Sequence, residues 1–204
     1  MESTSLFHRI SRLSLYVLGA LIPLWFLPIT QNSLEFQKQA LLALLVFAGL
    51  VTWLAALLQA GKATIRLAWQ APLLLAFLVS GLLSVLFSLW PAGSFWGFPL
   101  DVTNGFLTQA LFICFAFLVM NAFSETKQLF KLLLITLLSV FAASMFAGAQ
   151  IFKLLSFLPF TFTSTQLFNT IGSPNGIAMI AGALLPLALA LAFVSRFFLR
   201  LLLW

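Results

Sequence analysis

Charged residues divide this chain into long uncharged blocks. Six stretches contain no Asp, Glu, Lys or Arg, and they cover residues 13–34, 39–61, 67–100, 102–124, 132–152 and 154–195. Each block contains at least 21 residues, whereas a helix needs roughly 20 apolar residues to cross the hydrocarbon core of a bilayer. The pattern therefore predicts a helical protein that crosses a membrane several times.

Prolines and turn-forming residues set the limits of the predicted helices. Pro72 suits the first turn of a helix, because it has no N–H group to leave unpaired. The last block is too long for one span, and Gly172-Ser173-Pro174-Asn175-Gly176 marks a boundary inside it. We predict an all-α, polytopic transmembrane helix bundle, a single domain over residues 1–204. Its six complete spans are expected at about 13–29, 40–58, 72–90, 105–123, 132–152 and 175–194, and the start of a seventh at 196–204.

The few charged residues predict the orientation of the bundle. The chain is 63% apolar and has ten Lys or Arg but only four Asp or Glu residues. A cytoplasmic N-terminus leaves only Lys38 and Lys153 in outer connections, and it places these basic residues inside: Arg9, Arg12, Lys62, Arg66, Lys127, Lys131, Arg196 and Arg200. Basic residues favour the cytoplasmic side. Because they are scattered over helix ends and form no basic face, we predict no nucleic-acid partner.

Several kinds of chemistry are excluded by composition. Cys114 is the only cysteine and His8 the only histidine, so the chain has no internal disulfide and no histidine cluster for a metal. No Asp, Glu, Lys, Arg or His lies near the middle of a predicted span, and ion-coupled transporters usually need one there. We predict no metal site, no cofactor and no catalytic residue within this chain.

The boundary before the sixth span is the most structured signal. Ser173 is a good N-cap and Pro174 a good first helical residue. The free N–H groups of that helix start would face the outer membrane boundary, where they suit a phosphate group. Lys153, at the end of the preceding span, would add positive charge. The alternative is a well-capped helix with no ligand.

Two segments resemble the bacterial O-antigen ligase/polymerase family. Ser94-Phe95-Trp96-Gly97-Phe98-Pro99, followed by Asn104-Gly105-Phe106-Leu107-Thr108, resembles the outer loop and fourth-helix start of that family. The segment from Phe168 to Ala178 is similar to the family's Gly-Asn/Ser-Pro-Asn segment, which precedes a helix rich in small residues. The matching positions are Trp96, Gly97, Gly105, Gly172, Pro174 and Asn175, which the resemblance implies to be structural or adjacent to the lipid carrier.

The resemblance implies an integral enzyme of the bacterial inner membrane. Such enzymes move a glycan from an undecaprenyl-diphosphate carrier to a lipid or sugar acceptor at the external face, so membrane lipids and a lipid-linked oligosaccharide are the implied partners. The family's functional groups are external arginines and a histidine in a large external loop of the later half. This chain has no external arginine, and His8 is predicted to be cytoplasmic. We therefore expect an N-terminal membrane portion whose C-terminal half supplies the catalytic groups.

Two other functions stay open. The first is a multi-pass membrane transporter or export subunit. The second is a small structural membrane protein that assembles through small-residue faces, such as Ala143/Ala147 and Ala178/Gly182. Pairs of small residues at this spacing let two helices approach closely in lipid, although they also serve packing within one chain.

Overall fold

The computed structural model describes residues 6–27, 34–61, 65–66, 69–97, 102–154, 169–172 and 174–202. These residues form helices, turns and connections without any β-strand. The helices are α1 (Leu6–Leu21), α2 (Leu34–Ala60), α3 (Ala71–Leu86), α4 (Pro91–Trp96), α5 (Phe106–Ala122), α6 (Thr126–Ile151) and α7 (Pro174–Leu202). The predicted all-α class is confirmed.

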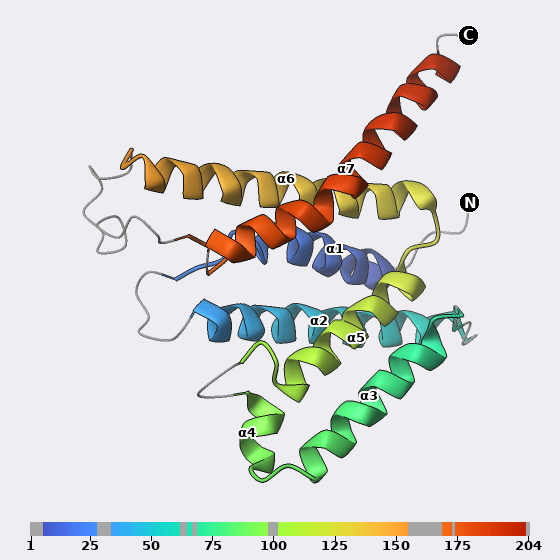
Figure 1. The fold of residues 1–204 in the computed structure, drawn as a ribbon. Helices are drawn as coiled ribbons and strands as arrows, with labels where there is room; N and C mark the ends of the chain where they lie inside the picture. Colours follow the sequence, from blue (N-terminus) through green and yellow to red (C-terminus); the bar gives the residue numbers. More distant parts are fainter. Residues whose placement is uncertain are drawn as a thin grey trace.

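The longer helices form a bundle with two distinct ends (Figure 1). Helix α1 packs against α2 and α6, α5 packs against α1 and α2, and α3 and α4 both pack on α5. Helix α7 crosses α6 (Figure 1). We call the end that holds α4 and the starts of α2 and α7 the α4 end. The opposite end, with the first turn of α1 and the end of α5, is the His8 end.

Two of the described helices are long and apolar enough to cross a membrane, namely α2 and α6. Helices α3 and α5, together with residues Asn175–Leu191 of α7, are apolar but shorter. The structure thus supports an all-helical chain with two helices of spanning length. The six-span arrangement remains a proposal.

Several predicted boundaries differ from the structure. Helix α1 ends at Leu21 instead of near residue 29, because the residue before a proline disfavours the helical region and Pro23 follows closely. It also begins at Leu6, seven residues before the predicted start at residue 13. Helix α2 is longer than predicted at both ends, and α6 begins six residues earlier than expected.

The region predicted as a loop after the third span contains a further short helix, α4. Its start follows the rule that proline suits the first helical position, since Pro91 occupies it. Helix α3 ends at Leu86, so the predicted span 72–90 is shorter as a helix.

Helix α7 begins at Pro174, as predicted, and continues without a break to Leu202. The predicted division between a sixth span and a seventh segment near residue 195 is therefore wrong as secondary structure. No Gly or Pro occurs between Val194 and Leu202 to end the helix. Pro186 lies inside it, and a proline in a helix interior removes one hydrogen bond and bends the axis. Figure 1 shows α7 bending as it crosses α6.

Small and polar residues bring the helices of the centre into close contact. The buried face of α1 carries Ser11 and Ser14 beside Leu15 and Leu18, which is the spacing of one helical face. The Ser11 hydroxyl donates to the Gly49 carbonyl oxygen of α2 at 3.1 Å. A Cβ on Gly49 would lie 2.9 Å from Ser14 Oγ and 3.0 Å from Leu118 Cδ1. Helices α1, α2 and α5 therefore meet at a position where a larger residue would not fit.

Large apolar side chains lie mainly on the outside of the bundle. Helix α3 has a single buried residue, Val85, while Leu73, Leu75 and Phe77 on the same helix are each more than half exposed. Buried polar residues include Gln39, Asn121 and Ser139. Such a distribution suits a surface covered by lipid, because hydrocarbon does not drive apolar side chains inward.

Candidate functional site

The first segment of the family resemblance folds into one close contact at the α4 end. Gly97 ends α4 in the left-handed conformation, with φ 72°, and its N–H donates to the Gly93 carbonyl at 2.7 Å. Gly105 precedes α5 as its N-cap residue. A Cβ on Gly105 would lie 2.7 Å from Gly97 N and 2.8 Å from the Trp96 carbonyl carbon and oxygen. Main chain thus packs directly on main chain here, which only glycine allows.

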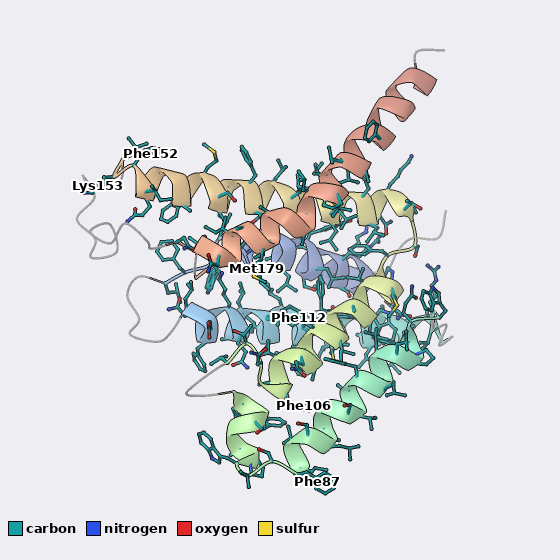
Figure 2. All side chains as sticks on the ribbon, viewed as in Figure 1. Phe87, Phe106, Phe112, Phe152, Lys153 and Met179 are labelled. Atoms are coloured by element: carbon teal, nitrogen blue, oxygen red, sulfur yellow. The ribbon has the colours of Figure 1, made fainter. Side chains whose placement is uncertain are left out.

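Aromatic rings extend this contact. The rings of Phe95 and Trp96 meet edge to face, with centroids 5.2 Å apart, a preferred geometry for aromatic pairs. Phe95 also contacts Phe106 in the first turn of α5, at 5.9 Å; Figure 2 labels Phe106 where α5 begins. A Cβ on Gly81 of α3 would approach the Phe106 ring to 3.1 Å. The start of α5 is therefore held by both α3 and α4.

The indole of Trp90 is held against the first turn of α4. A Cβ on Gly93 would lie 2.2 Å from the Trp90 ring, so the ring lies directly on the Gly93 main chain. The Ser88 hydroxyl is 2.6 Å from that of Ser94 and accepts the main-chain N–H of Trp90 at 3.1 Å. Backbone contact and hydrogen bonds together fix the position of this tryptophan.

A buried chain of hydrogen bonds connects α2 to the same region. The Gln39 amide donates from Nε2 to the Thr108 hydroxyl at 2.8 Å. That hydroxyl donates to the Val102 carbonyl oxygen at 2.7 Å. All three residues are buried. The chain therefore fixes the segment before α5 onto α2.

These elements enclose a pocket of about 330 Å³ between α2 and α4. We call it the aromatic pocket, and its lining residues are Phe36, Gln39, Trp90, Ala92 and Trp96. Trp90 and Trp96 are 53% and 54% exposed, so ring faces remain accessible to a ligand. Gln39 is the only polar side chain in the lining, and no lining residue titrates. The pocket can bind a ligand with an apolar face, but it offers no acid, base or nucleophile.

The second segment of the resemblance lies at the start of α7. Asn169 and Thr170 are buried, and the Asn169 side-chain oxygen accepts the N–H groups of Ile171 and Gly172 at 3.0 and 2.8 Å. Gly172 has φ 117° and lies beside Leu34 of α2, with 3.8 Å from its ideal Cβ to Leu34 Cδ2. A glycine is needed at that φ, because other residues are strained there.

The remaining predicted positions have separate outcomes. Ser173 lies outside the described residues, so its capping role stays a prediction. Pro174 is the first residue of α7, and Asn175 follows it with an exposed side chain. Lys153 is exposed just after α6, as Figure 2 shows, with φ 56°. The described contacts do not bring Lys153 to the start of α7.

The first two turns of α2 contact both segments. Leu34 lies beside Gly172, whereas Phe36 and Gln39 line the aromatic pocket. The sequence pattern predicts no pocket role for Phe36, Gln39, Trp90 or Thr108, although Thr108 belongs to the first resembling segment. One signal was available, since Gln39 is a polar residue at the start of an apolar block.

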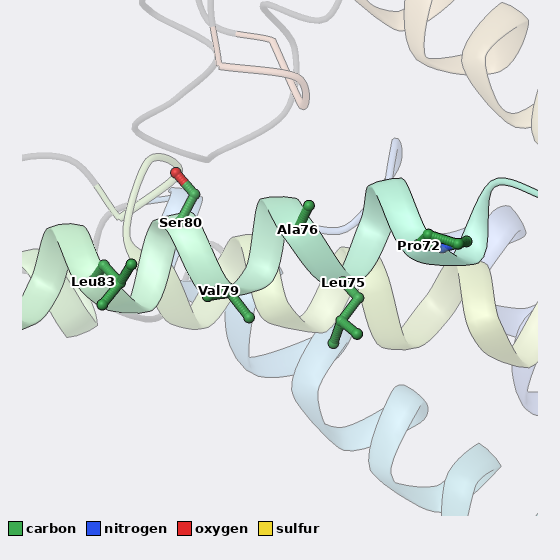
Figure 3. A pocket seen from close by; sticks show the side chains of 6 residues that line it. All are labelled: Pro72, Leu75, Ala76, Val79, Ser80 and Leu83. Atoms are coloured by element: carbon green, nitrogen blue, oxygen red, sulfur yellow. The ribbon is translucent and has the colours of Figure 1, made fainter.

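Two other depressions are apolar. One, of about 680 Å³, lies between α3 and α5 towards the His8 end. The other, of about 530 Å³, is lined by Pro72, Leu75, Ala76, Val79, Ser80 and Leu83. Figure 3 shows that all six of these side chains belong to α3, so this depression is the open face of one helix.

Comparison with known proteins leaves the chain without an assigned family. No family model matches it, and no match was found among curated proteins or among solved structures.

Proposed function

We propose that this chain is the membrane part of an O-antigen ligase-like or polymerase-like protein, which acts on a glycan linked to undecaprenyl diphosphate at the outer face of the bacterial inner membrane. The observation that carries the proposal is the contact of Gly105 with the main chain of Trp96 and Gly97. Trp96 and Gly97 lie apart from Gly105 in sequence, yet the three residues of the first resembling segment pack together. Their glycines occupy positions that require glycine for space or for φ.

The aromatic pocket supports a binding role for this unit. Two accessible tryptophans and a buried amide face the same space, and aromatic side chains with few polar groups are typical of ligand pockets. The pocket lies at the α4 end, which the positive-inside rule assigns to the external side. In this proposal the pocket holds the sugar or the first prenyl units of the carrier, and the reacting groups come from outside this chain.

A genetic experiment tests the proposal. Deletion of the gene from its bacterial host is expected to remove the surface glycan and to cause carrier-linked glycan to accumulate on the external side. The intact gene should restore the glycan, and a Trp90→Ala, Trp96→Ala variant that inserts normally should restore much less. Accumulation of the carrier-linked glycan on the cytoplasmic side would favour an export subunit instead. Unchanged surface glycan after deletion would overturn the proposal.

Orientation has its own test. Reporter fusions at Gly97 and at Lys62 are expected to report external and cytoplasmic positions. The opposite result would place the aromatic pocket on the wrong side for a carrier-linked glycan.

A further inference from the structure

Three basic residues gather at the His8 end of the bundle. His8 and Arg12 lie one turn apart on α1, and Arg66 lies in the connection between α2 and α3. The His8 imidazole is hydrogen-bonded to the main chain of Ala122, and the charges of Arg12 and Arg66 both act on it. Basic residues from two separate parts of the chain therefore lie close together beside the end of α5.

The position of Arg66 is fixed by the end of α5. The main-chain N–H of Arg66 donates to the Asn121 side-chain oxygen at 2.8 Å, and its guanidinium donates from Nη1 to the Phe123 carbonyl oxygen at 3.3 Å. Asn121 is itself held by a bond from its Nδ2 to the Phe117 carbonyl, at 2.9 Å. The main chain of Arg66 is thus fixed on the end of α5, and the guanidinium makes one further bond there, which leaves most of its five donors available.

Neither arginine is neutralised by a carboxylate in the described structure. The described hydrogen bonds of Arg12 and Arg66 go to carbonyl oxygens. Glu125, the N-cap residue of α6, lies at the same end and is exposed, and the described contacts include no ion pair from it to either arginine. The charges of Arg12 and Arg66 are therefore available to an external anion.

An apolar groove begins beside this group. It has a volume of about 680 Å³, within the roughly 300–1,000 Å³ typical of ligand pockets. Its lining side chains come from α3, α5 and Trp69 just before α3, and they include Cys114 and Met120 of α5. None of these side chains is charged, so the groove suits a hydrocarbon chain.

The groove and the basic group share an edge. Met120 lines the groove, and the next residue, Asn121, holds Arg66. Trp69 also lines the groove, is 78% exposed and follows Arg66 by three residues. Arg66 is thus held by the residue next to the groove lining, so a phosphate at Arg66 and an acyl chain in the groove can belong to one lipid molecule.

We propose that the His8 end binds one anionic phospholipid, with its phosphate at Arg12 and Arg66 and one acyl chain in the groove between α3 and α5. The charge of the group selects for net negative headgroups. This proposal rests on the chain being embedded in a membrane, but it does not depend on glycan transfer. It also differs from a general role of basic residues in membrane insertion, which needs neither a fixed arginine geometry nor a groove.

Tryptophan quenching tests the proposal directly. The full chain is reconstituted in vesicles that contain a small share of phosphatidylglycerol or phosphatidylcholine with brominated acyl chains, which quench nearby indoles. Subtracting the quenching measured for Trp69→Phe from that of the full chain gives the quenching of Trp69. We expect Trp69 to be quenched at a lower mole fraction of brominated phosphatidylglycerol than of brominated phosphatidylcholine. Arg12→Gln and Arg66→Gln should each weaken this preference by about fivefold, whereas Lys127→Gln, an equal charge change at the same end, should preserve it.

Two further measurements separate the binding of the lipid headgroup from the binding of the acyl chain. Cys114→Phe fills the groove and should reduce Trp69 quenching while both arginines remain. Millimolar inorganic phosphate should leave the preference for phosphatidylglycerol unchanged, because it has no acyl chain; loss of the preference would indicate a site for free anions and overturn the proposal. Equal quenching by the two lipids, or no effect of either arginine substitution, would also overturn it. Vesicles without glycan keep these outcomes independent of the proposed transferase function.

Discussion

Gly105 lies so close to Gly97 that a single added methyl group would stand 2.7 Å from the Gly97 nitrogen. Gly97 ends α4, and Gly105 is the N-cap residue of α5. Their contact sets how α4 lies on α5, and through α4 it sets the position of Trp90 and Trp96 in the aromatic pocket.

Gly105→Ala is expected to destabilise this region by about 1–3 kcal/mol, which is the usual effect of overpacking. The methyl group would meet main-chain atoms, which cannot turn away as a side chain can. A lower apparent melting temperature of the protein in detergent would report it. Gly148→Ala is the matched control, since a Cβ there has nothing within 4 Å. Equal melting temperatures for the two variants would contradict the close contact.

Thr108→Val tests the buried chain of hydrogen bonds from α2. Valine keeps the shape of threonine but leaves the Gln39 amide and the Val102 carbonyl without this partner. An unsatisfied buried polar group costs about 1–3 kcal/mol, so a clear loss of thermal stability is expected. Thr52→Val should have little effect, because the Thr52 hydroxyl bonds only to carbonyls of its own helix. A larger loss at Thr52 would argue against the chain of bonds.

Gly93→Ala should move the Trp90 indole away from α4. The new methyl group would overlap the ring, so the ring must leave its place in the pocket wall. Collisional quenching by acrylamide is expected to rise for Trp90, measured as the difference from a Gly93→Ala, Trp90→Phe double variant. If accessibility did not change, Trp90 would not rest on Gly93.

His8 gives the stability of the chain a pH dependence. His8 lies before the first uncharged block. Its pKa is lowered from the ordinary value of 6.5, mainly because the imidazole is partly buried and also because Arg12 is positively charged. The unfolded chain therefore binds more protons than the folded one at mildly acidic pH. The stability contribution is complete above the unfolded pKa of about 6.5, and it is lost as pH falls through the lower folded value.

His8→Gln should flatten this dependence. Melting temperatures of the unmodified chain are expected to fall from pH 7 to roughly pH 5, and those of the variant should change less over that range. Because His8 is the only histidine of the chain, this one substitution removes all histidine titration. An equal fall in melting temperature for both proteins would show that His8 is not the source of the pH dependence.

The helices that were predicted well have clear end signals in the sequence. Helix α5 matches its predicted bounds within one residue, and α7 begins at Pro174 as predicted. Glycine at an N-cap and proline at the first helical position act locally, so sequence alone reveals them. The start of α1 was predicted poorly, because Arg9 and Arg12 were treated as flanks of the apolar run. The buried face of α1 instead uses serines that a hydropathy pattern does not mark.

The candidate site was predicted only in part. Trp96, Gly97 and Gly105 were selected by resemblance, and the structure brings them together. The contributions of Gln39 and Thr108 could not be foreseen, because their hydrogen bond joins residues 69 positions apart in sequence. Long-range pairing of this kind depends on how α2 lies against α5, which no local pattern specifies.

Ser11, Ser14 and Gly49 lie where α1, α2 and α5 meet, while the large apolar side chains of α3 face outward. Cohesion therefore depends on short contacts and hydrogen bonds between helices more than on exclusion of water. Salt concentration should have little effect on the stability that these contacts provide, because they involve no exposed charges. The choice of detergent should matter much more, because a small polar headgroup that reaches the helix seams can compete for the serine donors. Mild, long-chain detergents are the natural medium in which to purify this protein intact.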